Sequence, residues 1–443
     1  MPPPSPPSRP GGRLLLVNYE FPPLGGGGGA VTANLAQQWT AMGWSVRVLT
    51  SAYAGLPRRE TIDGYEVIRV PTLRRRHDRC SIPEMALALA GSLVAAPLTA
   101  ARWRPDLTVC FFGLPGGPAG WLVKRLFGIP YLVSLLGGDV PGFACGIDAY
   151  HALTGGIIRG LWRGACGVVA NSKGLAELAR HHAPDVAVAV APNGVDSLAF
   201  TPVATSRPDG PLRLLLVGRL VGQKGVDIML DALASVDAGL RPRLTVVGDG
   251  PDRPALEAQS RRLGLEAVVT FAGWVTRDRL ADTYRAHDVL VSPSRFEGMS
   301  LVLQEAMACG LPVVATRIPG SEEVVVDGET GLLITAEDVP ALAAAVTRLC
   351  REPALVSRWG HAGRQRVESL YTWRGVAESY QALAGLPATP YDRLAGSAMN
   401  PAGSAALSQD QHQRGFPVQP ARQPQHRPQH PQTMDPARHP LGQ

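Results

Sequence analysis

Lysine, cysteine and charged residues are all scarce in this sequence of 443 residues. Only Lys124, Lys173 and Lys224 supply lysine among the 43 Lys and Arg residues, and charged residues make up 18% of the chain. Arginine stands at almost every basic position, which indicates a bias in residue usage. We therefore do not interpret the net charge of +6 as a nucleic-acid-binding surface. A lysine that persists against this bias is a candidate for a specific role.

The six cysteines are scattered and include no C-x-x-C pair, which argues against a zinc site or a disulfide framework. Most of them lie in apolar runs, so the sequence predicts free, buried thiols in a reducing compartment. They are Cys80, Cys110, Cys145, Cys166, Cys309 and Cys350.

The sequence also shows no apolar leader. Its first residues, MPPPSPPSRPGG, have no apolar core and do not resemble a signal peptide. The longest uncharged apolar stretch, about 85–101, contains Pro97 and is shorter than a membrane span. We therefore expect a cytoplasmic protein.

Both ends of the chain differ in composition from the rest. Residues 1–12 are rich in proline, and residues 388–443 are rich in Pro, Gln, His, Ala and Ser. Such segments cannot bury enough apolar surface to fold, so we predict a disordered N-terminus and a disordered tail. Four histidines of the tail are compatible with metal chelation, although compositional bias is the favoured interpretation. These are His412, His426, His430 and His439.

Between the ends, short apolar runs alternate with helix-like segments, which is typical of parallel sheets covered by helices on both faces. A turn-rich stretch at 192–211 divides the pattern. We predict an α/β fold with two doubly wound, Rossmann-like domains, 13–200 and 201–370, facing each other across a cleft. The predicted strands span 13–19, 45–51, 107–113, 130–136, 167–172, 212–218, 243–248, 268–273, 288–293 and 312–316. The predicted helices span 30–43, 225–235, 253–264, 276–286, 300–309 and 371–385.

In sheets of this kind ligands bind beyond the carboxyl ends of the strands, and three motifs lie at that edge. The first is a run of glycines, Gly25 to Gly29, between the first strand and a helix. Glycine lets backbone amides approach a ligand closely, and a helix N-terminus favours an anion. Neither a P-loop nor a Rossmann fingerprint is present. A contact with phosphate or sugar is favoured over a flexible connector.

The second motif is VGRLVGQKGVD, in which strand 212–218 ends at Gly218 and Arg219 and Lys224 follow. Two cations at the carboxyl end of a strand suit a diphosphate. The alternative is a pair of solvated loop charges. Lys224 is one of the three lysines, which favours the phosphate role.

The third motif is SRFEGMSLVLQEAMACGLPVV, which holds Glu297 and Glu305. Glu297 follows a strand, and Gly298, Met299 and Ser300 begin a helix whose first amides have no partner within the helix. Glu305 lies on that helix among apolar residues, although a single Glu on a helix is often on a solvated face. A buried carboxylate needs hydroxyl or cationic partners, and ribose hydroxyls would serve.

The E-x7-E spacing within SPSRFEGMSLVLQEAMACGLPVVAT resembles the signature of the retaining glycosyltransferases of family 4, which have the GT-B fold. The resemblance covers residues 13–386 and is most specific in the C-terminal half. The segment 371–387 is similar to the helix that crosses back onto the first domain in this fold. Other landmarks occur in the same order: NYEFPPLGGGGG, LLGGDVPGF, APNGVD, VGRLVGQKGVD, VVGDGP, FAGWV and PGSEEVVVDGETGLL.

The resemblance implies a hexosyltransferase that uses a nucleotide-diphosphate sugar as co-substrate and no cofactor. Arg219 and Lys224 would meet the diphosphate, Glu305 the ribose and Glu297 the donor sugar. No D-x-D is present, so a metal is not indicated, and the family generally lacks a protein nucleophile. The catalytic residues implied are Arg219, Lys224, Glu297 and Asp139. The donor-binding residues implied are Gly25, Gly26, Gly27, Gly28, Gly218, Arg219, Lys224, Val275, Glu297, Gly298, Met299, Ser300 and Glu305.

The segment SLLGGDVPGF departs from the family pattern at one position. Leu136 stands where the family often has His or Arg, which touches the donor sugar or phosphate. Asp139 is in place, but the loss of the cation brings catalytic efficiency or the choice of donor into question. A turn-capping role before Val140 is the alternative for Asp139.

The acceptor is the least defined part of this interpretation. A basic run, RRRHDR (74–79), precedes an apolar segment at 83–103. Contact of 74–103 with an anionic membrane, at the inner face of the plasma membrane, would suit a lipid-linked acceptor in envelope or exopolysaccharide assembly; a saccharide or other small acceptor also fits. A solvated loop followed by a core helix is the favoured alternative for this segment. Two other functions stay open: a nucleotide-sugar epimerase and a non-catalytic protein that binds nucleotide sugars.

Overall fold

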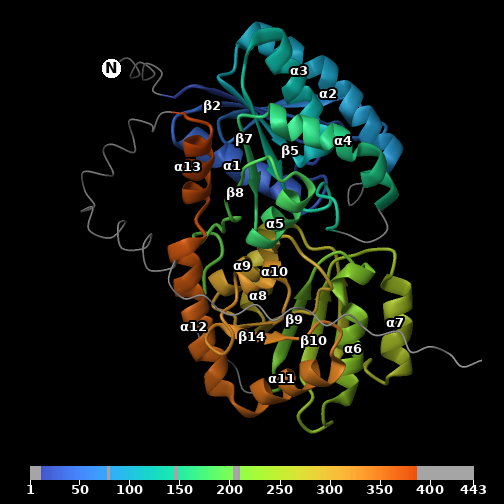
Figure 1. Ribbon diagram of the computed structural model, residues 1–443. Helices are drawn as coiled ribbons and strands as arrows, with labels where there is room; N and C mark the ends of the chain where they lie inside the picture. The colour runs from blue at the N-terminus through green and yellow to red at the C-terminus, as the bar shows by residue number, and fades with distance from the viewer. Residues whose placement is uncertain (1–10, 77–79, 144–147, 203–209, 387–443) are drawn as a thin grey trace, which may run out of the picture. The chain divides into compact units, whose positions relative to one another are not determined.

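The structure, a computed structural model, describes residues 11–76, 80–143, 148–202 and 210–386. Two sheets covered by helices make up this part of the chain, as Figure 1 shows, which confirms the α/β class and the Rossmann-like architecture. The predicted disordered ends lie outside the described residues, apart from Gly11 and Gly12, and so do Cys145 and the four histidines of the tail.

The first sheet has the strand order β3-β4-β2-β1-β5-β6-β7-β8. Every neighbouring pair is parallel except β3 and β4, which form an antiparallel hairpin. Its strands are β1 Arg13–Val17, β2 Ser45–Ser51, β3 Arg59–Ile62, β4 Tyr65–Val70, β5 Leu107–Phe111, β6 Tyr131–Leu135, β7 Gly167–Ala170 and β8 Val188–Val190. The connecting helical elements are α1 Gly27–Ala41, α2 Ile82–Trp103, η1 Phe112–Gly116, α3 Gly117–Phe127, α4 Asp148–Gly164 and α5 Lys173–His182.

Alternate residues of β1 point to opposite faces of the first sheet, and both sets are apolar. Leu14 and Leu16 belong to a core with residues of α1, whereas Leu15 and Val17 belong to a core with residues of α2 and α3. A strand buried on both faces needs a continuous apolar run, which explains why RLLLV forms the centre of a parallel sheet.

The second sheet is parallel throughout, with the order β11-β10-β9-β12-β13-β14. Its strands are β9 Arg213–Val217, β10 Arg243–Val247, β11 Val269–Gly273, β12 Val289–Ser292, β13 Val313–Thr316 and β14 Gly331–Ile334. Its helical elements are η2 Gly222–Lys224, α6 Val226–Ser235, α7 Arg253–Arg262, α8 Arg277–Arg285, α9 Leu301–Ala308, α10 Pro319–Glu322, α11 Val339–Arg351 and α12 Pro353–Leu370.

The last helix, α13 (Trp373–Leu383), packs against the first sheet and not the second. The Trp39 ring nitrogen on α1 donates a hydrogen bond to the Ala377 carbonyl at 3.3 Å, and the Tyr380 and Ser134 hydroxyls are 2.7 Å apart. This confirms the predicted crossover helix. The position of the domain boundary, which we expect between β8 and β9, stays a prediction.

All ten predicted strands are present, with ends that differ by at most two residues. Sequence reasoning missed β3 and β4, which are joined by Asp63 and Gly64, both with left-handed backbone φ of 47° and 88°. Asp-Gly is a strong hairpin signal because this turn needs positive φ at both positions. The strands β8 and β14 and the helices α3 to α5 and α10 to α12 were also not predicted as such, whereas α2 matches the helix expected at 83–103.

Two helices, α1 and α2, begin or extend differently from what the sequence predicted. The helix α1 begins at Gly27, three residues before the predicted start, so Gly27 to Gly29 form its first turn. The helix α2 continues through Pro97 and has 22 residues, which makes it long and apolar enough to cross a membrane by length and composition, with 22% of its apolar window buried. The expectation that this run is shorter than a span is therefore wrong for its length.

Cysteine burial is mixed. The five described cysteines are free, as predicted, and Cys110 and Cys309 are buried. Cys166 is exposed and two others are half-buried, so the prediction of buried thiols holds only in part.

Candidate functional site

The predicted diphosphate motif lies at the carboxyl end of β9. Gly218 and Arg219 follow this strand, and Lys224 ends the short 3-10 turn η2. A Cβ on Gly218 would lie 3.3 Å from the Lys224 side chain, so glycine leaves room for the lysine to pass. Gly225 has a φ of 64°, and a Cβ there would lie 2.0 Å from the Pro293 carbonyl oxygen. Glycine is therefore required for the turn that aims Lys224 toward the loop after β12.

Lys224 and Glu297 form an ion pair in which the Lys224 Nζ donates to the Glu297 Oε1. The exposed fractions of the two side chains are 20% and 11%, so the pair is largely shielded from water. Sequence reasoning placed both residues at one site but assigned them to different parts of a donor. In the structure they neutralise each other.

Glu305 is buried in α9, with 5% of the residue exposed, as the apolar neighbours predicted. The Tyr284 hydroxyl on α8 donates to its Oε2 at 3.0 Å, and Arg277 Nη1 lies 3.6 Å from its Oε1. Burial raises the pKa of Glu305, and the positive charge of Arg277 and the Tyr284 hydrogen bond act in the opposite direction.

Arg277 and Tyr284 are two site residues that sequence reasoning missed. The signal was the buried carboxylate itself, because it requires cationic or hydroxyl partners from neighbouring elements. Val275, one of the predicted donor-binding residues, lies two residues before Arg277 in the loop between β11 and α8 and packs against the core that holds Met299.

The start of α9 is held in place by Asn193, which belongs to the APNGVD segment. The Asn193 side-chain amide donates to the Met299 backbone carbonyl at 3.2 Å, and the Asn193 backbone carbonyl accepts a hydrogen bond from the Gln304 side chain at 2.6 Å. Ser300 is the N-cap residue but makes no side-chain cap hydrogen bond. Buried Gly298 has little room for a side chain, since a Cβ would lie 3.2 Å from the Asn171 Oδ1. The predicted amides are thus fixed at the mouth of the helix.

Asn171 is another residue that sequence reasoning did not single out. It follows β7 of the first sheet and is 4% exposed, and its Oδ1 is buried with no hydrogen-bond partner among the described residues. The same Cβ on Gly298 would also lie 3.2 Å from the Leu136 carbonyl oxygen. Groups from β6 and β7 therefore reach the start of α9.

Glu20 is a carboxylate that contacts the glycine-rich loop. Its carboxylate accepts a hydrogen bond from the Gly26 amide at 3.3 Å, and Gly25, with a φ of 83°, curls so closely around it that a Cβ would lie 2.5 Å from the carboxyl carbon. Burial raises the pKa of Glu20, while the Gly26 amide and the positive charges of Arg74 and Arg219 lower it. The carboxylate lies where an anion would meet the loop.

The other glycines of the loop differ in their surroundings. A Cβ on Gly26 or Gly27 would meet open space, whereas one on Gly28 would lie 2.7 Å from the Phe112 ring and 3.4 Å from the Leu136 side chain. Leu136 thus lies close to the loop, at the position where the family often has a cation.

Asp139 is buried and accepts hydrogen bonds from three backbone amides, those of Gly113 at 2.9 Å, Gly137 at 3.1 Å and Leu136 at 3.2 Å. Burial raises the pKa of its carboxyl group, and the amides act in the opposite direction. This arrangement ties the Leu136–Gly137 backbone to η1, which matches the capping alternative. A catalytic role for Asp139 stays a prediction.

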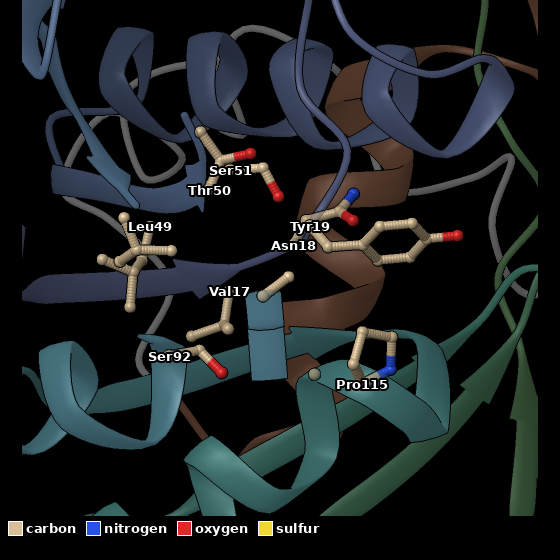
Figure 2. A pocket seen from close by; sticks show the side chains of 11 residues that line it. Val17, Asn18, Tyr19, Leu49, Thr50, Ser51, Ser92 and Pro115 are labelled. Atoms are coloured by element: carbon tan, nitrogen blue, oxygen red, sulfur yellow. The ribbon is translucent and has the colours of Figure 1, made fainter. Parts of the chain in front are cut away.

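A small cavity lies at the carboxyl ends of β1 and β2 (Figure 2). Its volume of about 10 Å³ is close to that of a single water position. The Thr50 and Ser51 hydroxyls beside it are buried without a hydrogen-bond partner among the described residues, so a bound water would satisfy them. The cavity is too small for any part of a nucleotide sugar.

Comparison with known protein families gives two matches along the chain. A family described as "Glycosyl transferase 4-like domain" matches residues 26–194, and one described as "Glycosyl transferases group 1" matches residues 211–352. Among the described residues, no group of three or more His, Cys, Asp or Glu side chains is arranged to hold a metal ion.

Two curated relatives are similar over most of the chain. A glycogen synthase of Mycobacterium tuberculosis is 30% identical over 392 residues, which is 82% of this chain and 92% of the relative. A D-inositol 3-phosphate glycosyltransferase of Nocardiopsis dassonvillei is 31% identical over 406 residues, covering 83% and 92% of the two chains.

Solved structures agree on the fold. The sucrose-phosphate synthase of Thermosynechococcus elongatus superposes with a TM-score of 0.74 at 25% identity, covering 87% of this chain and all of that one. The Anabaena HepE protein in complex with UDP-glucose superposes with a TM-score of 0.67 at 20% identity, covering 85% of this chain and all of that one.

Proposed function

Since this chain belongs to the family 4, or group 1, glycosyltransferases with the GT-B fold, we propose that it transfers a hexose from a nucleotide-diphosphate sugar to an acceptor hydroxyl with retention at the anomeric carbon. The convergence of Lys224, Glu297 and the start of α9 at the carboxyl edge of the second sheet is the observation that carries this proposal. A diphosphate fits an edge that offers a lysine and unpaired helix amides.

The proposed chemistry needs no protein nucleophile. The acceptor oxygen forms its bond to C1 as the bond between C1 and the diphosphate oxygen breaks, and the acceptor proton passes to the leaving diphosphate on the same face. Arg219, Lys224 and the amides of Gly298 to Ser300 would stabilise the charge that develops on the leaving group. Glu297 would hold the donor sugar, and Glu305 would accept hydrogen bonds from ribose hydroxyls.

The reaction is further proposed to be independent of metal ions, because two cationic side chains lie where a divalent ion would otherwise neutralise the diphosphate. Equal rates in EDTA and in Mg²⁺ are the expected result. A strict requirement for Mg²⁺ would show that Arg219 and Lys224 do not suffice.

A non-catalytic nucleotide-sugar-binding protein is the second candidate, and Leu136 favours it. Its side chain approaches Gly28 with an apolar group at the position where the family often has a cation. An epimerase would require further acid and base residues at the donor sugar, and no convincing set was identified.

Donor hydrolysis without acceptor separates these functions. The purified protein is incubated with UDP-, GDP- and ADP-hexoses, beginning with UDP-glucose because the HepE relative is seen with it. Turnover of one donor that Lys224→Ala and Glu305→Ala both abolish is the expected result. Lys124→Ala, which removes an exposed Nζ that donates to the Gly164 carbonyl, is the matched control. Tight donor binding with no turnover, with or without acceptors, would favour the non-catalytic function.

We further propose a cytoplasmic location with peripheral contact at an anionic membrane, as expected for a lipid-linked acceptor. Support comes from α2, whose buried residues are small (Ala88, Ser92, Ala96 and Ala100) while its larger apolar side chains face outward. Exposed apolar residues at or near this helix are Leu73, Ile82, Leu87, Val94 and Leu98.

Exposed Arg75 and Arg76 lie just before α2, and exposed Arg102 lies in its last turn. A basic and apolar surface is complementary to anionic lipid headgroups. Co-sedimentation with vesicles of phosphatidylglycerol, but not of phosphatidylcholine, is expected, and Val94→Glu should reduce it. Leu370→Glu, at an exposed apolar position on α12, is the control, and equal binding of Val94→Glu would contradict the proposal.

A further inference from the structure

The short turn η2, which carries Lys224, has little apolar anchoring of its own. None of its three residues, Gly222, Gln223 and Lys224, is buried. A segment without buried side chains is kept in place by its polar bonds, and a loosely held lysine loses conformational entropy when it binds a phosphate. The bonds between η2 and the loop that joins β12 to α9, residues 293–300, therefore decide where the Lys224 ammonium group lies.

The backbone of the β12–α9 loop lies directly against this turn. The Arg295 amide donates to the Gln223 carbonyl at 2.8 Å, and the Gln223 side-chain amide donates back to the Phe296 carbonyl at 2.9 Å. The two segments are 73 residues apart in the sequence, and they meet because β9 and β12 are neighbouring strands. These two bonds fix η2 beside the residues that precede Glu297.

The Arg295 side chain adds four hydrogen bonds and ties three segments together. Its Nη1 donates to the Gly222 carbonyl of η2 and, at 3.0 Å, to Oδ1 of Asp227 in the first turn of α6. Its Nη2 donates to the other oxygen of Asp227 at 2.8 Å, and its Nε donates at 2.8 Å to Glu337, which follows β14. A bidentate bond of this kind fixes the direction of a guanidinium group as well as its distance.

The charge of Arg295 is already matched by two carboxylates, those of Asp227 and Glu337. A guanidinium group so fully engaged is better suited to hold the protein together than to bind a diphosphate itself. Glu337 also has a left-handed backbone φ of 62°, which is uncommon for a residue with a side chain. Such conformations persist where the surroundings fix them, and they gather at functional sites.

We infer that Arg295 is a positioning residue for the diphosphate: it clamps η2 to the β12–α9 loop and so holds the Lys224 ammonium group beside Glu297. The inference rests on the proposed glycosyltransferase function. Under that function Glu297 meets the donor sugar, so its partner Lys224 lies at the sugar end of the diphosphate, at the phosphate from which the sugar departs. A cation that is fixed there beforehand stabilises the leaving group without having to be reoriented.

The test compares nucleoside diphosphates with monophosphates by calorimetry: UDP against UMP, and GDP and ADP against their monophosphates. The phosphate that Lys224 meets is present only in the diphosphate. Arg295→Lys keeps the positive charge and loses the bidentate bond, so it should weaken the preferred diphosphate roughly 10-fold and leave the monophosphate unchanged. The control is Arg213→Lys, which should change neither affinity. Arg213 holds Asp288 by an equivalent bidentate bond, at 2.8 and 3.1 Å, between the amino ends of the same two strands.

Asp227→Asn tests the clamp from its other side, with an expected result opposite to that of simple electrostatics. Loss of a negative charge near a diphosphate would by itself tighten binding, whereas loss of the clamp weakens it. We expect Asp227→Asn to weaken the diphosphate, as Arg295→Lys does. In a Lys224→Met background neither variant should weaken binding further, because both act through the lysine.

The outcomes separate this inference from the proposed function. An unaltered protein that binds no nucleoside diphosphate would refute the proposed function and the inference with it. Diphosphate binding that Arg295→Lys and Asp227→Asn leave unchanged or tighten would overturn the clamp alone. Equal weakening of mono- and diphosphate, or an undiminished loss in the Lys224→Met background, would show that Arg295 supports the whole site or contacts the ligand, and would overturn its assignment to Lys224.

Discussion

The ion pair between Lys224 and Glu297 predicts that removing a negative charge from Glu297 tightens the binding of a nucleoside diphosphate. Without a ligand, the Lys224 Nζ is bonded to the Glu297 carboxylate. A diphosphate must compete for this ammonium group, so Glu297→Gln should release it. The same variant should lose turnover, because the proposed contact with the donor sugar is weakened.

The size of the effect follows from the burial of the pair. Fully exposed ion pairs contribute about 0.2 to 1 kcal/mol, whereas removing one partner of a fully buried pair costs about 3 to 5 kcal/mol. Because the Lys224 and Glu297 side chains are 20% and 11% exposed, an intermediate value of about 1 to 2 kcal/mol is expected. This corresponds to a dissociation constant that falls roughly 5- to 30-fold.

Calorimetric titration with UDP, GDP and ADP measures the effect without the sugar. Lys224→Met should weaken binding of the preferred nucleotide. In the Lys224→Met background, Glu297→Gln should increase nucleotide affinity by a smaller factor, because no lysine is left to release. Glu378→Gln, which breaks an exposed pair with Arg374, serves as the control and should change nothing. Weaker nucleotide binding by Glu297→Gln would refute the reasoning and show that Glu297 supports the nucleotide site.

Three further outcomes follow from the buried carboxyl groups. Tyr284→Phe removes a hydrogen bond to buried Glu305 and should cost about 1 to 3 kcal/mol of unfolding free energy in urea titrations. The Asp139→Asn variant offers one acceptor oxygen to three amides, so the melting temperature of this variant should fall by several degrees. An unchanged melting temperature would contradict the capping role. Burial raises the pKa of Glu20, so the folded state keeps a proton that the unfolded state loses as the pH rises past about 4.5, and stability should decline above that pH. Glu20→Gln should remove that part of the pH dependence in melting curves.

The fold was largely predictable because its strands are buried on both faces. Runs such as RLLLV, in both β1 and β9, are typical of strands at the centre of a parallel sheet. Edge elements were harder to predict. The edge strand β3 is half-buried or exposed at every position, so it lacks the buried apolar run that marks the central strands.

The candidate site was predictable as motifs but not as contacts. Arg219, Lys224, Glu297 and Glu305 were identified from the residues that follow strands and from a carboxylate in an apolar helix. That Lys224 pairs with Glu297 could not be predicted, because 73 residues separate them and only the strand order brings β9 and β12 together. Glu20 was missed because it lies in a part of the loop that the motifs did not single out, where its carboxylate accepts from the Gly26 amide.

The carboxylates of the site share one property that explains its chemistry. Glu297 pairs with Lys224 and Glu305 lies near Arg277, so two cations at the donor edge already face acidic side chains. For Lys224, whose side chain is 20% exposed, this pairing keeps a largely shielded positive charge from being left alone, which would be costly; Arg277 is exposed. A donor brings its own negative charges and must displace or neutralise these acids. Glu20 and Glu305, whose pKa values are raised by burial, are the acids most readily neutralised by a proton, so donor binding and proton uptake should be linked.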